Sequence, residues 1–194
     1  MKSNSSQKGV SLIEVLVTTV VLSIGVLGVA GLGAFAKRST YEAVQRSVAT
    51  ELGYALLEEM RMNKDALGTY LAAGTLGGGA LGGEPAPDCD APGADCTAAE
   101  FASHSLWLWE RVIDSGLEAN AGNESGGLLS PTACIAGPVG ATAGVYTVTV
   151  VWRGVSEATT DNGLTNCGDG SGLYGAGEAF RRVVIVQSYM DPTV

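Results

Sequence analysis

The chain has 194 residues, a formal net charge of -9 at pH 7, four cysteines and one histidine. This length fits one globular domain together with an anchoring segment. The only adjacent basic pairs are Lys37-Arg38 and Arg181-Arg182. Nucleic-acid binding needs clustered cations, so this acidic chain is not expected to have a nucleic-acid partner.

An apolar run, residues 10–36, follows a short polar leader that contains Lys2 and Lys8. As a helix the run would be about 40 Å long, which is enough to cross a bilayer. The positive leader predicts that the N-terminus stays cytoplasmic and that the remainder is exported. Because the run is longer than a signal-peptide core and no small-residue cleavage site follows it, we expect it to remain as an anchor.

Glu14 is the only charged residue inside this run. A carboxylate in hydrocarbon costs about 2.5–3.5 kcal/mol on insertion scales, and the run holds no cation to pair with it. Cleavage after Gly9 would give Val10 a free ammonium group one helical turn from Glu14. A neighbouring copy packed in register would offer the same group. The residues therefore predict a cleaved, membrane-anchored helix whose buried charge is paired on assembly.

The stretch Lys8-Gly-Val-Ser-Leu-Ile-Glu-Val-Leu16 resembles the class III signal of type IV prepilins and type II secretion pseudopilins. The resemblance implies that a prepilin peptidase cuts between Gly9 and Val10 and that the amine of Val10 becomes N-methylated. It also implies that Glu14 helps to register subunits in a filament. Val10 departs from the family pattern, in which Phe or Met is more usual. Residues 20–32 are most similar to the PilV group of minor pilins.

This resemblance implies a structural subunit that starts assembly of a type IV pilus near its tip, not an enzyme, and without a cofactor. The implied partners are the prepilin peptidase, other minor and major pilins, the inner-membrane assembly platform and a PilY-type adhesin. The chain would lie in the inner membrane before assembly and on the pilus at the cell surface afterwards. Two alternatives stay open, a minor pseudopilin of a type II secretion system and a signal-anchored exported binding domain.

The predicted fold is α+β and pilin-like. A long N-terminal helix, membrane-spanning in its first half, packs on a small antiparallel β-sheet head with a short second helix. We expect four segments: a leader 1–9, a transmembrane and filament-core helix 10–36, an amphipathic continuation 37–64, and a disulfide-containing head 65–194. Apolar residues spaced by three and four predict the buried stripe of the continuation. They are Tyr41, Val44, Val48, Leu52, Ala55, Leu56 and Met60.

Residues 65–100 are rich in glycine and proline and are predicted to be loop that buries no core. A second helix is expected over 98–118. Its apolar face would be Phe101, Leu106, Trp109, Val112, Ile113 and Leu117. Trp107 lies off this face, where it would cap the cluster, be exposed or anchor a neighbouring subunit. His104 has no nucleophile motif around it, so no catalytic triad is predicted.

Two long strands are predicted over 146–153 and 180–189, with a loop over 154–177 between them. A shorter third strand is expected around Ile135 or within 154–177. Val151 breaks the alternation of the first strand, which is typical of a strand covered on both faces. Residues 161–170 hold oxygen ligands and glycines, but their spacing matches no EF-hand, so turn formation is favoured over calcium binding.

The four cysteines, Cys89, Cys96, Cys134 and Cys167, all follow the apolar run. Behind an export signal, disulfide bonds are the natural interpretation. Three pairings are possible, and the sequential one is favoured because it puts the first bridge inside one loop. The spacing of the first pair is wrong for a zinc knuckle, so no metal site is predicted there.

Overall fold

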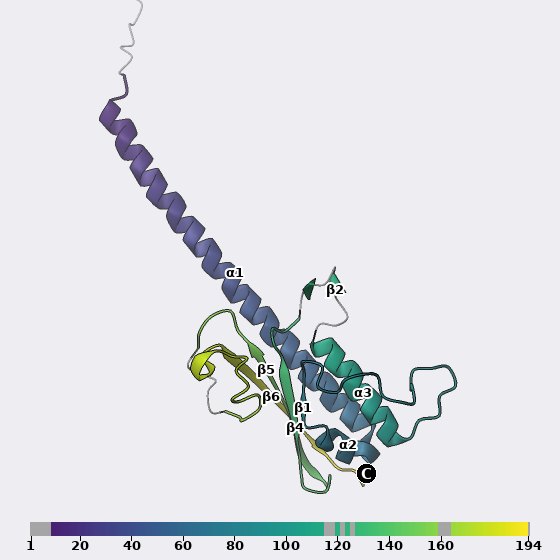
Figure 1. Cartoon of the computed structure of the whole chain (residues 1–194). Coiled ribbons are helices and arrows are strands. Elements are labelled where there is room, and N and C mark those ends of the chain that lie inside the picture. The colour runs from purple at the N-terminus through teal and green to yellow at the C-terminus, as the bar shows by residue number, and fades with distance from the viewer. Residues whose placement is uncertain (1–8, 115–118, 121–122, 125–126, 159–163, 194) are drawn as a thin grey trace, which may run out of the picture. The chain divides into compact units, whose positions relative to one another are not determined.

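The computed structural model describes residues 9–114, 119–120, 123–124, 127–158 and 164–193 (Figure 1). Two compact units make up the chain, Met1–Tyr41 and Glu42–Val194. The predicted α+β class is confirmed, since a long apolar N-terminal helix is followed by a small antiparallel sheet and further helices.

Helix α1, Leu12–Met62, is one continuous helix. It begins where the Ser11 carbonyl accepts hydrogen bonds from the backbone N–H groups of Glu14 (3.0 Å) and Val15 (3.3 Å). Within the first unit the helix has no described buried residue. By length and composition, α1 qualifies as a candidate membrane span, with a mean hydropathy of 2.4 in its most apolar window.

The face that α1 buries matches the predicted stripe only in part: Leu56 and Met60 are buried, and Val48 and Leu52 pack against the core. The buried residues are Gln45, Ala49, Gly53, Leu56, Leu57 and Met60, whereas Tyr41 and Val44 are about half exposed. The prediction of Leu56 and Met60 was right, but it passed over Ala49 and Gly53. A Cβ at Gly53 would lie 2.7 Å from Cγ2 of Val186, so the absent side chain lets the sheet approach the helix.

Three short elements follow α1 in a region predicted to be loop. They are the 3₁₀ turn η1, Lys64–Ala66, helix α2, Leu67–Ala72, and strand β1, Thr75–Leu76. Leu67, Tyr70 and Leu76 are at most 1% exposed. The prediction that this region buries no core was therefore wrong, because apolar side chains precede and interrupt its glycines.

Helix α3, Ala98–Ile113, starts at a capping box in which Thr97 and Glu100 exchange hydrogen bonds. Residues 115–118, including Leu117 of the predicted face, lie outside the described residues. Leu106, Trp109 and Ile113 are buried as predicted, but Phe101 and Val112 are exposed. Figure 1 shows α3 beside the C-terminal part of α1, and the indole N–H of Trp109 donates to the Leu52 carbonyl at 2.9 Å.

The main sheet has four antiparallel strands in the order β1-β4-β5-β6. Strands β4, Thr132–Ala136, β5, Gly144–Arg153, and β6, Arg181–Met190, correspond to the three expected strands. A separate two-stranded sheet pairs β2, Ala119–Asn120, with β3, Asn123–Glu124. A second 3₁₀ turn, η2, spans Ala176–Glu178.

Both faces of strand β5 are covered. Tyr146, Val148, Val150 and Trp152 belong to the main core with the helices. Val151 packs on the other face with Cys167, Tyr174 and Val183. The prediction that this strand is covered on both faces is therefore confirmed. Cys134 is bonded to Cys167 and Cys89 to Cys96. The first of these bonds fastens the segment that covers the second face.

Candidate functional site: the N-terminal assembly segment

The bond between Gly9 and Val10 precedes the first helical residue of α1. Gly9, Val10 and Ser11 are all exposed and have no regular secondary structure. A Cβ on Gly9 would meet no atom within 4 Å. This segment is therefore open to an enzyme that must hold the chain in an extended form.

Glu14 lies in the first turn of α1 and is exposed. Among the described residues it takes part in no ion pair. The first turn of a helix presents free backbone N–H groups and the positive end of the helix dipole, which favours a carboxylate by about 0.3–1 kcal/mol at an exposed site. This is smaller than the cost of a carboxylate in hydrocarbon, so the turn alone does not compensate for burial.

The large apolar side chains of residues 10–35 are all at least half exposed, from 50% at Val20 to 82% at Leu12. A soluble monomer rarely exposes an apolar surface of this extent. We therefore expect lipid or other helices to cover this surface.

The hydroxyl groups of Thr18, Thr19 and Ser23 in the same stretch are hydrogen-bonded within the helix. Thr18 Oγ1 donates to the Val15 carbonyl at 2.9 Å, and Ser23 Oγ donates to the Thr19 carbonyl at 2.7 Å. Thr19 donates to the Val15 carbonyl as well. Because these hydroxyls need no water, they do not oppose placement of the helix in an apolar medium.

Four glycines, Gly25, Gly28, Gly31 and Gly33, lie in the second half of the apolar run, and a Cβ on any of them would meet no other atom within 4 Å. Val21, Leu22, Val26, Val29 and Ala30 surround a hollow at Gly25 on the surface of the helix. Small residues let a second helix approach closely in a membrane. The hollow is thus suited to contact with another apolar helix.

The glycine-rich loop predicted in the head is held by two carboxylates, which the sequence did not indicate. The Glu110 carboxylate is 2% exposed and accepts hydrogen bonds from the backbone N–H groups of Gly77, Ala80 and Leu81, at 2.7–2.9 Å. Asp114, one turn further along α3, accepts from Gly78 and Gly79 at 2.8 and 2.9 Å. The sequence signal for this contact was two acidic residues four apart at the end of one helix, together with a glycine run elsewhere in the chain.

Trp107 packs beneath the same loop and is only 9% exposed. Its indole N–H donates to the Gly82 carbonyl at 3.2 Å, and the Arg111 guanidinium lies 4.9 Å from the centre of its ring. The interpretation of Trp107 as an exposed anchor for a neighbouring subunit was therefore wrong. Trp107 does lie off the predicted apolar face of α3, but the loop covers it there, so it is not exposed to solvent.

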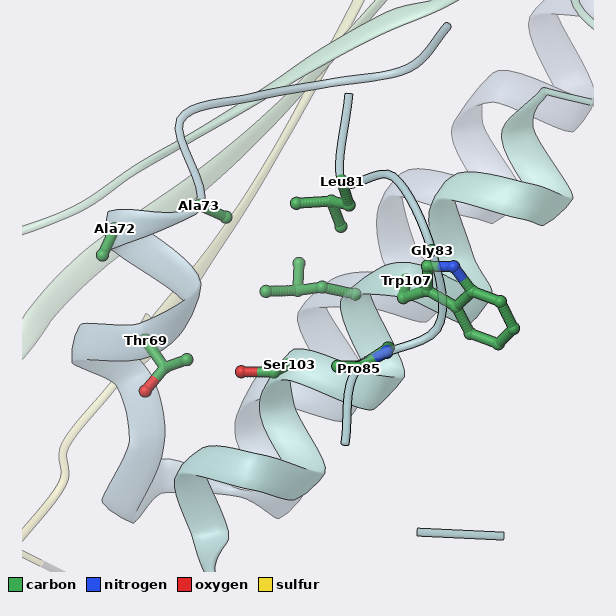
Figure 2. Close-up of a pocket in the computed structure, with 9 residues that line it drawn as sticks. Thr69, Ala72, Ala73, Leu81, Gly83, Pro85, Ser103 and Trp107 are labelled. Carbon is green, nitrogen blue, oxygen red and sulfur yellow. The ribbon is translucent and has the colours of Figure 1, made fainter. Parts of the chain in front are cut away.

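A cavity of about 290 Å³ lies between α2, α3 and this loop (Figure 2). Thr69 and Ser103 supply its hydroxyl groups. The remaining lining consists of Ala72, Ala73, Leu81, Gly83, Pro85, Leu106 and Trp107. The lining provides no charged group, so the cavity is suited to a small apolar group at most.

Residues 4–30 match the family model described as the prokaryotic N-terminal methylation motif. Residues 4–30 are thus similar to the N-terminal segment of type IV prepilins. This motif marks prepilin substrates of the type IV pilin and pseudopilin type, which are structural subunits. It implies processing by a prepilin peptidase and handling by pilin assembly machinery in general. Comparison with curated proteins gave no match, and neither did comparison with solved structures.

The matched segment contains the three predicted site residues Gly9, Val10 and Glu14, which lie close together in the sequence. The four cysteines lie in the second unit. Cleavage, methylation and charge pairing at the individual residues are taken up in the proposal that follows.

Proposed function

We propose that this chain is a minor type IV pilin of the PilV kind that takes part in starting pilus assembly near the filament tip. The peptidase removes residues 1–9, and the new N-terminal amine of Val10 is methylated. The observation that carries the proposal is Glu14. It is the only charge in the exposed apolar run, residues 10–36, and it lies inside the methylation motif.

The assembly step follows from the charge of this helix. Glu14 in lipid carries a cost of about 2.5–3.5 kcal/mol. The N-terminal ammonium of Val10 in a neighbouring copy would neutralise it and supply hydrogen bonds. The paired state is thus favoured over the monomer in the membrane, and the pairing also fixes the register between helices.

The proposed partners follow from the same step. Other minor pilins and the major pilin would contribute the neighbouring helices, and the inner-membrane platform would extract the chain from the bilayer. A PilY-type adhesin would join the head at the tip. The chain would start in the inner membrane with its N-terminus cytoplasmic and its head periplasmic. It would end on the pilus at the cell surface.

A minor pseudopilin of a type II secretion system would use the same N-terminal chemistry. Support for the pilus comes from the similarity of residues 20–32 to the PilV group. The two systems differ in phenotype, because loss of a minor pilin reduces surface filaments whereas loss of a pseudopilin reduces protein secretion. Both phenotypes should be read in a strain that lacks this chain.

The test replaces Glu14 by Ala in the full chain, expressed in its native host, with Glu51→Ala as the matched control. Glu51 is an exposed glutamate of the same helix in the second unit. We expect both variants to be inserted in the membrane and to begin at a methylated Val10 by intact mass. Glu14→Ala should be at least about tenfold depleted from sheared filaments, because each 1.4 kcal/mol is tenfold in an equilibrium.

Normal incorporation of Glu14→Ala would refute the charge-pairing step. Assembled chains that still carry residues 1–9 would refute processing as well, because Val10 would then have no free amine. In that case the chain would be a signal-anchored exported binding domain.

A further inference from the structure

We propose that the head binds one divalent transition-metal ion of the zinc type through Glu84, Asp88 and His104. These residues form the one group of three possible metal ligands within the part of the chain that the structure describes. Glu84 and Asp88 lie in the loop before Cys89, and His104 lies on α3. The site is in the second unit and does not depend on the proposed function.

His104 is the residue that carries the inference. Its side chain is 3% exposed, and its Nε2 atom has no hydrogen-bond partner. Buried polar atoms are almost always paired, so an unpaired one calls for an explanation such as an ion. Nε2 faces the two carboxylates, at 3.5 Å from Oε1 of Glu84 and 3.6 Å from Oδ1 of Asp88.

The two separations from Nε2 are those of ligands around a shared ion. The three ligand atoms lie within 4.8 Å of one another. Two ligands bound to zinc at about 2.0–2.2 Å in tetrahedral geometry are about 3.3–3.6 Å apart. The distances are longer than a good hydrogen bond between imidazole and carboxylate, and an ion placed between the three atoms would satisfy all of them.

The loop that carries the carboxylates is fixed on both sides. Before Glu84, the Leu81 N–H donates to Glu110 at 2.8 Å and the Gly82 carbonyl accepts from Trp107. After Asp88, the Cys89–Cys96 disulfide closes the loop. The Asp88 carboxylate also accepts from the Asp90 N–H at 3.0 Å, an outer contact that orients a ligand.

The donor set selects the class of metal. An imidazole nitrogen with two carboxylates suits zinc and its neighbours, whereas calcium and magnesium prefer ligand sets made of oxygen alone. No thiolate is available beside the site, because Cys89 and Cys96 are bonded to each other. The side chains of Glu84 and Asp88 are 46% and 54% exposed, so water can enter as the fourth ligand.

The experiment uses the full chain, purified in detergent micelles and stripped of metal by a chelator. Zn²⁺ is titrated by calorimetry, and the ¹⁵N signals of the imidazole are followed by NMR. His104 is the only histidine, so its Nε2 resonance is unambiguous. We expect one equivalent of Zn²⁺ to bind and to shift the Nε2 resonance of His104.

The test variants are His104→Gln and the double variant Glu84→Gln/Asp88→Asn. The matched control is Asp95→Asn, an exposed carboxylate inside the Cys89–Cys96 loop. Loss of both carboxylates should weaken Zn²⁺ binding at least about 100-fold, the upper end of the effect of outer-shell changes, and Asp95→Asn should leave it unchanged. Because Glu84 and Asp88 are exposed, the double variant tests the site even if His104→Gln does not fold.

Two results would overturn the assignment. One is a folded wild-type chain that takes up no Zn²⁺, in which case the two carboxylates approach His104 without a shared ion. The other is uptake with unchanged affinity in the double variant, or with no shift of Nε2, which would place the bound zinc elsewhere on this acidic chain.

Discussion

The two units of this protein place apolar and charged side chains in opposite ways. In the first unit, from Gly9 to Tyr41, every described residue is exposed, although most are apolar. In the second unit, three charged residues are buried: Glu110 is 2% exposed, Arg181 1% and Arg182 7%. The difference shows that whether a side chain is exposed or buried in this protein depends on where its interaction partner lies. The first unit offers its apolar surface to partners outside the chain, whereas the second supplies partners for its own charges.

Backbone groups supply most of the partners for the buried charges. Arg181 donates to the carbonyls of Thr165 and Cys167, both at or below 2.7 Å. Arg182 donates to the Ser156 carbonyl at 2.7 Å and to Glu42 at 3.2 Å. The backbone groups of a loop that forms no β-sheet hydrogen bonds need other partners. The side chains of Arg181 and Arg182 provide them.

The largest effect that would test this comparison is expected at Glu110. Glu110→Ala removes the acceptor of three backbone N–H groups and should lower the free energy of unfolding by about 3–5 kcal/mol. All three tryptophans, Trp107, Trp109 and Trp152, lie in the second unit. Denaturant unfolding of the full chain in micelles, followed by tryptophan fluorescence, therefore reports on that unit.

The control for this prediction is Glu51→Ala, an exposed glutamate on α1, which should change the unfolding free energy by less than about 0.5 kcal/mol. If Glu110→Ala and Glu51→Ala had equal effects, the loop would not depend on the buried carboxylate. The comparison between the two units would then lose its main support.

Two glycines of α1 give a second, smaller contrast. Gly53→Ala would put a Cβ 2.7 Å from Cγ2 of Val186, while Gly28→Ala would meet nothing within 4 Å. Valine is branched and cannot move its methyl group freely. The overpacking should exceed the helix propensity that alanine gains, which is about 1 kcal/mol. We expect Gly53→Ala to lower the unfolding free energy of the second unit by about 1–2 kcal/mol. Gly28→Ala, which lies in the first unit, should leave that free energy unchanged.

The same fluorescence measurement checks both glycine variants. A stabilising Gly53→Ala would mean that the sheet can move away from α1 at low cost. The close approach of the sheet to α1 at Gly53 would then contribute nothing to stability.

The sequence predicted the long helix and the sheet well because both depend on local patterns. The apolar run and the alternation in Tyr146–Arg153 are periodic signals of considerable length. The helical stripe was placed wrongly at Tyr41 and Val44, since hydrophobicity does not show that Ala49 and Gly53 are needed for close approach. Small residues at an interface are selected by shape, which a hydropathy pattern does not record.

The head loop was the least predictable part. Its order comes from contacts between Gly77–Leu81 and carboxylates about 30 residues away on α3. Likewise, Glu84 and Asp88 meet His104 only after the loop has folded back. The three residues follow no known metal motif. The N-terminal segment is different, because its signal is contiguous, and residues 4–30 are recognisable as a methylation motif.

The smallest expected effect concerns two glutamates of α1 within the second unit, whose pKa values move in opposite directions. Burial favours a higher pKa for Glu42, but hydrogen bonds from Ser156 and the Arg182 guanidinium outweigh it and lower the pKa below its ordinary 4.5. Burial raises the pKa of Glu59 above 4.5, against the opposing hydrogen bond from Ser105. Relative to the unfolded chain, folding therefore favours the ionised form of Glu42 and the protonated form of Glu59.

The sign of each contribution follows from these directions. Glu42 stabilises the fold above pH 4.5, and this stabilisation is lost as the pH falls through its lowered pKa. Glu59 acts in the other window, because stability declines as the pH rises from 4.5 through its raised pKa. The free energy of unfolding is measured in urea between pH 3.5 and 7. Glu42→Gln should reduce the loss of stability below pH 4.5, by under about 1 kcal/mol, and Glu59→Gln should reduce the loss of stability above pH 4.5. If both variants changed the stability on the same side of pH 4.5, the partners assigned to one of these carboxylates would be wrong.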